Sequence, residues 1–471
     1  MYHGQGPVGR DRATEHLIDV AEWAVTELRR SADYVQVYVS RTLEIKVECV
    51  DGKVLATCVE PHEGLGCLIR QGTRWRYRHV SPSAIGELLS WPAAAGSGTK
   101  PDDDRAGGGM SGPVSLSGWL PAWQGAAHPP AFTPTPAEEW LVRDTGNVHS
   151  LRTLEDFTSR AFAVVDTEGI RAASASRTVR QRVEATVTVN GHHYRGLSRR
   201  LVRGADTEGK YLPGADGISR IALGHALDSA AAEVRGKHRT PVVFGPAAAA
   251  GFLHELVGHA LEGDNFALHS DYLTRLRRRG AVPEPLTLQD DPTRADGYGS
   301  YDIDDEGVAA QVTTLLANGE IGPPLSSVRT VHRDGYIPTG NGRRKHYRDV
   351  AIPRASNTVA LPGKEDPEAL LHDGSGGVLY VGGLGAGMIN LVTGEYSFAA
   401  LNCFFITPGG HRVPARDVSL YGDALDTLGR IEGIGRDFGG DNISCGKQGQ
   451  MIGIGIHSPS MRYAELDWSA A

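Results

Sequence analysis

Residues 246–264 read PAAAAGFLHELVGHALEGD and follow a short apolar run, PVVFG, at 241–245. This pattern predicts a buried strand followed by a helix that begins near Pro246, because proline is favoured in the first turn of a helix. Inside that helix stands HELVGH, at residues 254–259. Imidazole nitrogens are good zinc ligands, and a nearby glutamate can take a proton from a metal-bound water. The hexapeptide therefore indicates a zinc site, with Glu255 placed to act on the water.

The spacing of the two histidines sets a geometric condition on the helix. His254 and His259 are five residues apart, whereas the usual zinc helix spaces its histidines by four. Five residues of a regular α-helix turn through about 500°, against about 400° for four, so the two imidazoles point in different directions. We therefore expect the helix to widen into a π-type turn, or to end early, between Leu256 and His259. Gly258 is the expected hinge, because glycine adopts unusual backbone dihedral angles at little cost.

Two histidines do not complete a catalytic zinc site, which normally takes three protein ligands. The residues alone leave three candidates open for the third ligand: Glu262, His269 and the distant Cys445 in NISCGKQGQ, at 442–450. They also leave open a plainer interpretation, in which His254 and His259 are ordinary helix histidines whose hydrogen bonds are satisfied.

The first half of the chain predicts helices packed on an antiparallel sheet. Apolar residues recur at helical spacing over 12–30 and again over 217–235. Asp51-Gly52 and Asn190-Gly191 each separate two alternating runs, which is the strongest short-range signal of a β-hairpin. Two further segments are expected to be strands, at 34–41 and 66–77.

We divide the chain into an N-terminal α/β domain, residues 1–237, and a C-terminal domain, residues 238–471. Within the first domain, residues 91–136 are rich in glycine, proline, serine and aspartate, and we expect them to form a flexible insert. The expected fold class is α+β, because the first domain combines an antiparallel sheet with helices and the second carries the candidate zinc helix.

Composition narrows the classes of function. The 471 residues carry a net charge of −8, which excludes a generally basic nucleic-acid-binding protein. No stretch approaches the roughly 18 apolar residues of a membrane helix, and the first residues lack the apolar core of a signal peptide. We therefore expect a cytoplasmic protein that binds neither nucleic acid nor a membrane. The five cysteines are too few and odd in number, so no disulfide framework is expected.

Five separated segments together carry a family likeness: HELVGHALEGD (254–264), GSYDIDDEG (299–307), PTGNGRR (338–344), NTVALPG (357–363) and SCGKQGQ (444–450). In this order and spacing the sequence resembles the TldD/PmbA family of zinc peptidases, and its TldD-type, motif-bearing members in particular. The likeness covers residues 238–463 strongly and the N-terminal part more loosely.

The resemblance implies one zinc ion per chain, bound by His254, His259 and Cys445, with Glu255 as the general base. It also implies a C-terminal β-rich domain with a barrel-like core that bears the zinc helix. Members of the family work as dimers, so we expect either a homodimer or a heterodimer with a PmbA/TldE-like subunit.

The expected function is a zinc-dependent peptide or amide hydrolase that acts on an extended peptide or a peptide-like substrate, with natural-product (antibiotic) maturation as one expected role. The substrate is expected to bind as an added β-strand along a sheet edge. Two alternatives remain: a biosynthetic amidase that acts on a small molecule, and a zinc-bearing subunit without catalytic activity of its own.

Three residues of the glycine-rich loop are candidates for substrate binding, because an arginine there could hold a carboxylate with two hydrogen bonds. These are Asn341, Arg343 and Arg344. The acidic run DIDDEG, at 302–307, is expected to be a turn that packs domains together. Lys447 is expected either to support the ligand Cys445 or to lie at the surface.

Overall fold

The computed structural model describes residues 12–84, 87–88, 91, 148–203, 215–278, 280–295, 297–372 and 376–471. The expected flexible insert at 91–136 lies outside the described residues, apart from Trp91. Among the described helices, none is long and apolar enough to cross a membrane.

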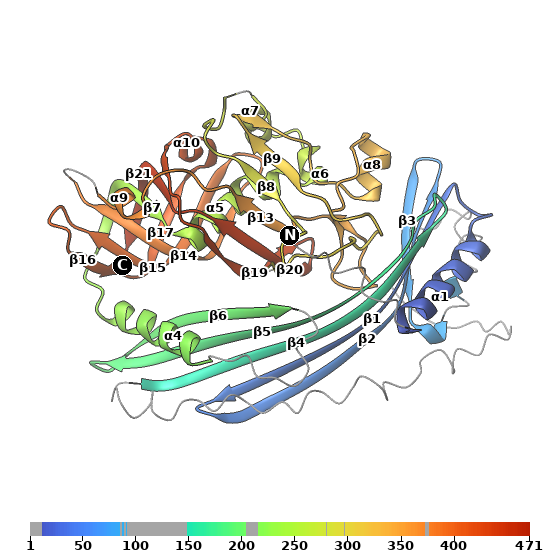
Figure 1. Cartoon of the computed structure of the whole chain (residues 1–471), viewed down its shortest axis with the longest axis horizontal. Coiled ribbons are helices and arrows are strands. Elements are labelled where there is room, and N and C mark those ends of the chain that lie inside the picture. Colours follow the sequence, from blue (N-terminus) through green and yellow to red (C-terminus); the bar gives the residue numbers. More distant parts are fainter. Residues whose placement is uncertain are drawn as a thin grey trace, which may run out of the picture.

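The N-terminal half forms one six-stranded antiparallel sheet that curves beneath the C-terminal half (Figure 1). The strand order is β3 (Arg74–Val80), β2 (Lys53–Gln71), β1 (Tyr34–Val50), β4 (Val148–Asp166), β5 (Arg171–Val189) and β6 (His192–Arg203). This confirms the expected antiparallel sheet with helices.

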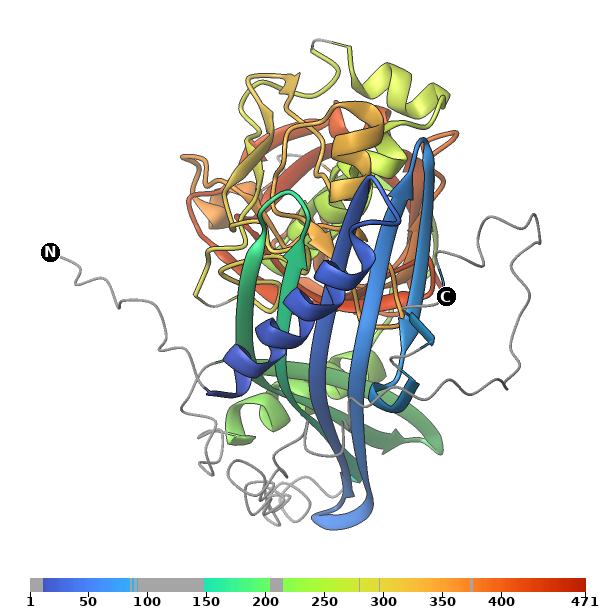
Figure 2. The same cartoon turned by 90° about the vertical axis from the view of Figure 1, so that its right-hand side faces the viewer.

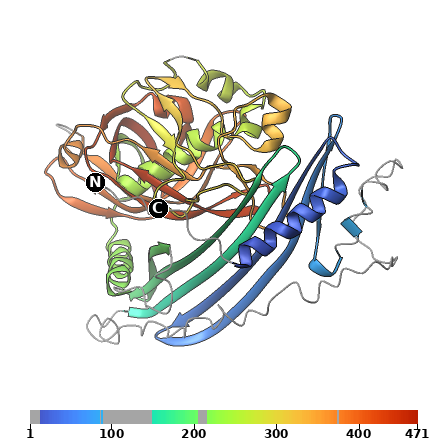
Figure 3. The same cartoon turned by 45° about the vertical axis from the view of Figure 1, so that its right-hand side comes forward.

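Two helices cover different parts of this sheet. Helix α1 (Arg12–Leu28) lies across the strands in Figures 2 and 3 and buries Leu17, Ala21 and Val25 against apolar residues of β1 and β2. Helix α4 (Ala215–Ala230) packs its own apolar side chains on β4 and β5. A short 3₁₀ turn, η1 (Pro82–Ala84), follows β3.

Both predicted hairpin turns are present. Asp51 and Gly52 have φ values of 49° and 77°, and Asn190 and Gly191 have 51° and 79°, as a two-residue hairpin loop of type I′ requires. The strands are longer than predicted, because β1 runs without a break from Tyr34 to the first turn. Strand β2 also continues through Pro61, which faces a sheet edge that β3 covers only from Leu65 onward.

The C-terminal half contains a closed five-stranded barrel, which confirms the expected barrel-like core. Strands β14 (Val378–Ile389), β7 (Gly236–Phe244), β21 (Met461–Ala470), β17 (Val418–Asp423) and β15 (Glu395–Ile406) pair in this order, and β15 closes the ring on β14. Two short strands extend the barrel: β16 (Arg412–Ala415) pairs with β15, and β18 (Ile431–Ile434) pairs with β21.

A second sheet lies beside the barrel in the order β10 (Glu320–Ile321), β9 (Thr313–Ala317), β8 (Leu288–Asp290), β13 (Asn357–Ala360), β20 (Gln450–Ser458) and β19 (Gly439–Lys447). Among the described strands, β19 is therefore an edge strand. The remaining elements are short: β11 (Gly342–Arg343), β12 (Ile352–Pro353), α6 (Gly263–Phe266), α7 (Asp271–Leu276), α8 (Val328–Asp334), α9 (Pro367–Leu370) and α10 (Ala424–Leu428).

Helix α5 (Pro246–Leu253) begins at the predicted proline and lies between the barrel and the second sheet. On one side Phe252 makes edge-to-face contacts with Phe244 and Tyr396 of barrel strands. On the other side Ala250 packs against the isoleucines of β20. The small side chains of this alanine-rich helix allow close approach on both sides, and its last turn leads directly into HELVGH.

Candidate metal centre

The helix widens where the two histidines lie. After α5 the backbone forms a π-helical turn, η4 (His254–Gly258), in which the N–H of His259 donates to the carbonyl oxygen of His254. A 3₁₀ turn, η5 (His259–Leu261), follows directly. The wider turn lowers the rotation per residue, so both rings face the same region and their centroids lie 4.7 Å apart. The predicted distortion of the helix is confirmed.

The expected role of Gly258 as a dihedral hinge is wrong. Its φ and ψ are both −54°, an ordinary helical conformation that any residue adopts. A Cβ atom at this position would instead lie 3.3 Å from Nδ1 of His254 and 3.6 Å from Oγ1 of Thr358. The glycine therefore provides space beside the His254 ring rather than freedom of the backbone.

Strand β19 brings a thiol to the two imidazoles. The Sγ atom of Cys445 lies 3.5 Å from Nε2 of His254 and 3.0 Å from Nε2 of His259, and the three potential ligand atoms all lie within 4.8 Å of one another. Burial alone would raise the pKa of Cys445, but hydrogen bonds from the two histidines outweigh it and lower the pKa to about 5. The sulfur is therefore a thiolate at neutral pH, which is the form that binds metals.

A threonine holds the ring of His254. Its Nδ1 atom lies 2.9 Å from Oγ1 of Thr358 on β13, and both side chains are fully buried. This contact fixes the ring so that Nε2 faces Cys445. The residues themselves gave no signal for Thr358, although it lies within the NTVALPG segment of the family likeness.

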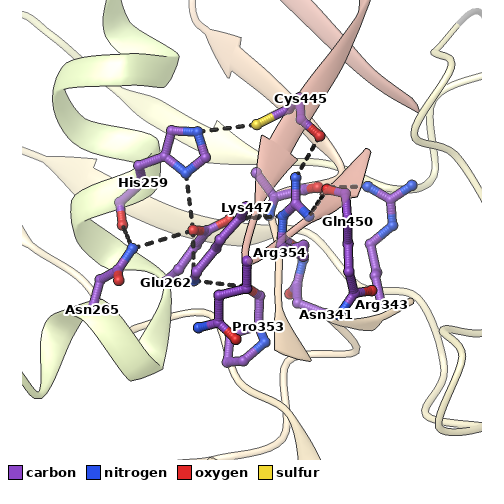
Figure 4. A network of polar contacts seen from close by, with 12 residues as sticks. His259, Glu262, Asn265, Asn341, Arg343, Pro353, Arg354, Cys445, Lys447 and Gln450 are labelled. Atoms are coloured by element: carbon purple, nitrogen blue, oxygen red, sulfur yellow. Dashed lines mark hydrogen bonds and ion pairs between the residues drawn. The ribbon is translucent and has the colours of Figure 1, made fainter. Parts of the chain in front are cut away.

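A charged network holds the ring of His259 from its other nitrogen (Figure 4). Oε2 of Glu262 lies 2.9 Å from Nδ1 of His259, and Nζ of Lys447 lies 2.9 Å from the same oxygen. Arg354 lies beside this carboxylate, with Nε 3.5 Å from Oε1, and donates to the carbonyl oxygen of Cys445 at 2.8 Å. Sequence analysis missed Arg354, for which the sequence carries no local signal.

Two of the three candidates for the third ligand do not reach the region that the Nε2 atoms of both histidines face. Glu262 contacts Nδ1 of His259, on the far side of the ring from Cys445. His269 is exposed and belongs to neither group of potential ligands among the described residues. The structure thus brings Cys445 to both Nε2 atoms.

Glu255 lies next to the ligand cluster and in contact with solvent. Its Oε2 atom is 3.9 Å from Nε2 of His259, and its side chain is 28% exposed. A carboxylate that is both near the ligand cluster and accessible to water can exchange protons with a water molecule there.

Most polar groups of the glycine-rich loop bond to protein, although Oδ1 of Asn341 and Nε of Arg344 are buried without a hydrogen-bond partner among the described residues. Asn341 is fully buried and donates to Asp290 at 2.6 Å, while Arg343 donates to the carbonyl oxygens of Ala355 and Gly453 at 2.6 and 2.8 Å. Arg344 is also buried, and its backbone N–H donates to Asp305. Substrate binding by Asn341, Arg343 and Arg344 stays a prediction.

The acidic run packs the two halves of the chain together, as expected. The carboxylate of Asp305 accepts a hydrogen bond of 2.7 Å from Arg160 of β4. Its neighbours Asp304 and Glu306 are buried and accept hydrogen bonds from backbone N–H groups, those of Gly342 and Val328 among them.

A second group of potential ligands lies on the N-terminal sheet: Glu44, Glu60 and His62. Nζ of Lys46 is 3.3 Å from a carboxylate oxygen of each glutamate, so an ammonium group already offsets one of the two negative charges of this site. The group contains no sulfur ligand and a single imidazole, and it is partly open to water. Its donor set therefore fits zinc less well than that of the cluster around Cys445.

Residues 237–469 match the family described as the PmbA/TldA metallopeptidase C-terminal domain, and they include His254, Glu255, His259 and Cys445. The chain belongs to the TldD/PmbA family.

Curated relatives of this TldD/PmbA family member match about half of the chain. The chain is 32% identical over 228 residues to a "Metalloprotease TldD homolog" of Buchnera aphidicola subsp. Schizaphis graminum, which covers 48% of this chain and 47% of the relative. It is 37% identical over 224 residues to a "Metalloprotease" of Methanothermobacter thermautotrophicus, covering 48% and 49%. The chain thus spans about half the length of these relatives.

The fold extends the likeness over nearly the whole chain. The crystal structure of TldE from Thermococcus kodakarensis superposes with a TM-score of 0.71 at 15% identity, covering 96% of this chain and 100% of that one. At this identity the similarity shows the fold, which both halves of the chain share with TldE.

Proposed function

We propose that this chain is a zinc-dependent peptide or amide hydrolase that binds one zinc ion through His254, His259 and Cys445. The observation that carries the proposal is the convergence of two imidazole nitrogens and one thiolate beside a solvent-accessible glutamate. The relatives named metalloproteases support a metal-dependent activity.

The donor set fits catalytic zinc. Two imidazoles and a thiolate are ligands that zinc prefers, and three protein ligands leave one position open, as catalytic sites do and closed structural sites do not. When bound, zinc polarises a substrate carbonyl and lowers the pKa of a coordinated water.

Glu255 acts as the general base in this proposal. Its carboxylate takes the proton from the attacking water and passes it to the leaving nitrogen, which departs as an amine. The exposed fraction of the side chain keeps the carboxylate in contact with water between turnovers. The two histidines, in contrast, are each held by a hydrogen bond at Nδ1, with Thr358 and with Glu262.

An extended substrate could pair with β19, which is an edge strand among the described strands. Near its beginning this strand is tied to the N-terminal sheet by an ion pair of 2.9 Å between Asp441 and Arg199, and Cys445 lies four residues further along. A peptide that pairs with the edge strand would place a main-chain carbonyl near the ligand cluster through backbone hydrogen bonds alone. This mode favours peptides over compact small molecules.

Replacement of Glu255 tests the hydrolase. Glu255→Gln should keep the bound zinc and the fold but reduce peptide hydrolysis by at least about 10²-fold. Glu368→Gln, an exposed glutamate on α9, is the matched control and should leave hydrolysis unchanged. Unchanged hydrolysis in Glu255→Gln would remove this residue from the mechanism.

The assay should be run with the chain alone and with a TldE-like subunit. The shared fold with TldE supports a dimer of related subunits, as a homodimer or a heterodimer. Activity only on small amides would favour the biosynthetic amidase, and zinc binding without hydrolysis under either condition would favour the non-catalytic subunit. The proposed thiolate ligand needs a reducing compartment, which fits a cytoplasmic location and a role in maturing peptide natural products.

A further inference from the structure

We infer that Glu262 and Lys447 are a pair of positioning residues that hold the two ligand-bearing segments together. Glu262 fixes the ring of His259, and Lys447 ties that carboxylate to the strand that carries Cys445. The inference rests on the metal centre proposed above and adds to it the groups that set its affinity.

The contact between Glu262 and His259 sets which nitrogen of the ring is free. A carboxylate only accepts hydrogen bonds, so Nδ1 of His259, at 2.9 Å from Oε2, carries the hydrogen. Without a metal, Nε2 can share a hydrogen with Sγ of Cys445, 3.0 Å away; in the neutral ring the hydrogen stays on Nδ1, and the lone pair of Nε2 faces the Cys445 side. Glu262 therefore selects the tautomer that can bind a metal on the Cys445 side.

The carboxylate of Glu262 is fully buried, and both of its oxygens accept hydrogen bonds. Oε2 also accepts from Lys447, at 2.9 Å, and Oε1 accepts from the backbone N–H of Ala355, at 3.2 Å, with Arg354 alongside. A buried charge is costly unless it is paired and hydrogen-bonded, and this one is both. The carboxylate is thus held in one place before any metal arrives.

Lys447 provides the link to the other ligand. It lies two residues after Cys445 on β19, so both side chains project from the same face of the strand. Besides Glu262, its ammonium group donates to Asp264 at 2.5 Å and to the carbonyl oxygen of Pro353 at 3.3 Å. A slip of β19 by one residue would turn Cys445 and Lys447 away together.

These contacts close a ring, which Figure 4 shows from nearby. It runs from His259 to Glu262, on to Lys447, along β19 to Cys445, and back to His259. Nδ1 of His254 contacts the neutral hydroxyl of Thr358, in contrast to the carboxylate that contacts Nδ1 of His259. The ion pairs that support a ring from its Nδ1 side therefore lie behind His259.

A carboxylate behind a metal-binding histidine raises the basicity of the ring and fixes its direction, and losing such a partner typically weakens metal affinity about 10–100-fold. We expect Glu262→Gln to weaken zinc affinity by about this factor. Lys447→Met should weaken it about tenfold, and Lys447→Arg, which keeps the charge, should recover most of the loss.

The experiment measures zinc affinity of the full chain by competition with a chromophoric chelator, and records the thiolate-to-metal charge-transfer band after loading with cobalt(II). Glu306→Gln is the matched control, because Glu306 is equally buried and makes no hydrogen bond to the three ligands among the described contacts. It should change zinc affinity less than twofold, whereas Glu262→Gln should also shift the cobalt band.

Each result decides the inference. Wild-type affinity in both Glu262→Gln and Lys447→Met, or equal losses in Lys447→Met and Glu306→Gln, would overturn it. If Glu262→Gln does not fold, the difference between Lys447→Met and Lys447→Arg decides alone. Failure of the wild type to bind zinc would reject the metal centre itself, whereas wild-type zinc binding with no hydrolysis would reject only the proposed reaction and leave this inference standing.

Discussion

Two clusters in this molecule place a lysine between two carboxylates, with a histidine beside them, and they differ in their access to water. On the N-terminal sheet, Lys46 lies 3.3 Å from both Glu44 and Glu60, with His62 close by. The Lys46 side chain is 47% exposed and that of Glu60 is 42% exposed. Water and salt screen these charges, so the cluster contributes little to folding.

In the C-terminal half the same groups are buried. Lys447 contacts Glu262 and Asp264, with His259 on the far side of Glu262, and the exposed fractions of Lys447 and Glu262 are 8% and 0%. Buried charges interact strongly, and the removal of one partner of a buried ion pair destabilises the folded protein. The two clusters thus differ in burial, and the buried one also lies beside a group of potential ligands that contains a second imidazole and a thiol, which the N-terminal group of potential ligands lacks.

The largest expected effect is on the amount of bound zinc, which should fall in variants of the C-terminal cluster and stay unchanged in a variant of the N-terminal cluster. Cys445→Ala and His254→Ala should each lose nearly all bound zinc, because two ligands do not hold the ion tightly. Glu60→Gln should leave one zinc per chain. Metal analysis of the purified variants measures this, and zinc retained in Cys445→Ala would return Glu262 or His269 to consideration as the third ligand.

The next effect concerns stability without metal. Lys447→Met removes the nearest cation from a buried carboxylate and should lower the free energy of unfolding by about 3 kcal/mol, at the low end for a broken buried pair because Arg354 remains. Lys46→Met should cause no measurable change, since its charges are screened. Urea unfolding of the metal-free proteins measures both, and similar losses would contradict the comparison.

Glu306 extends the comparison to a buried carboxylate without a lysine. Burial raises the pKa of Glu306 and of its neighbour Asp304 above their ordinary values. The folded state then holds protons that the unfolded chain releases, so the free energy of unfolding should fall as the pH rises from about 4.5 to about 8, by up to about 1.4 kcal/mol per pH unit for each group.

Glu306→Gln should make this pH dependence shallower, because the amide has no proton to lose. Urea unfolding at several pH values, for the wild type and the variant, measures the two slopes. Identical slopes would show that Glu306 does not titrate in this range.

The smallest expected effect concerns the hydrogen bond between His254 and the uncharged side chain of Thr358. Gly258→Ala should weaken zinc affinity a few-fold, since the new methyl group lies 3.3 Å from Nδ1 and crowds the contact with Thr358. Alanine favours helical backbone by about 1 kcal/mol over glycine, so the metal-free protein should not lose stability. Chelator competition together with thermal unfolding measures both, and a large loss of stability would point back to backbone strain.

Local features of the fold could be predicted from the sequence because they depend on neighbouring residues. The start of α5 at Pro246 follows from such rules, as do the turns at Asp51-Gly52 and Asn190-Gly191. The wide turn between His254 and His259 follows from their spacing alone. The lengths of β1 and β2 could not be predicted, because pairing partners far along the chain continue them.

The site was only partly predictable for the same reason. Among the residues themselves, nothing distinguished Cys445 from Glu262 as a partner of the histidines. The structure shows that each contacts a different nitrogen of His259. The role of Lys447 depends on β19 lying beside η5, and the reason for Gly258 depends on Thr358 of another strand. Contacts of this kind arise from tertiary packing, which periodicity and spacing do not encode.

The proposed ligands lie far apart along the chain, so they are made at different times during synthesis. Cys445 follows His259 by 186 residues. At roughly 5–20 residues per second, a ribosome needs about 10–40 s to make that stretch, during which the nascent chain carries both histidines and Glu255 but no sulfur ligand. A half-formed centre of this kind cannot hold zinc firmly. If the chain is the hydrolase proposed above, it would be unable to cleave peptide bonds, its own unfolded segments included, until β19 has emerged and paired with β20.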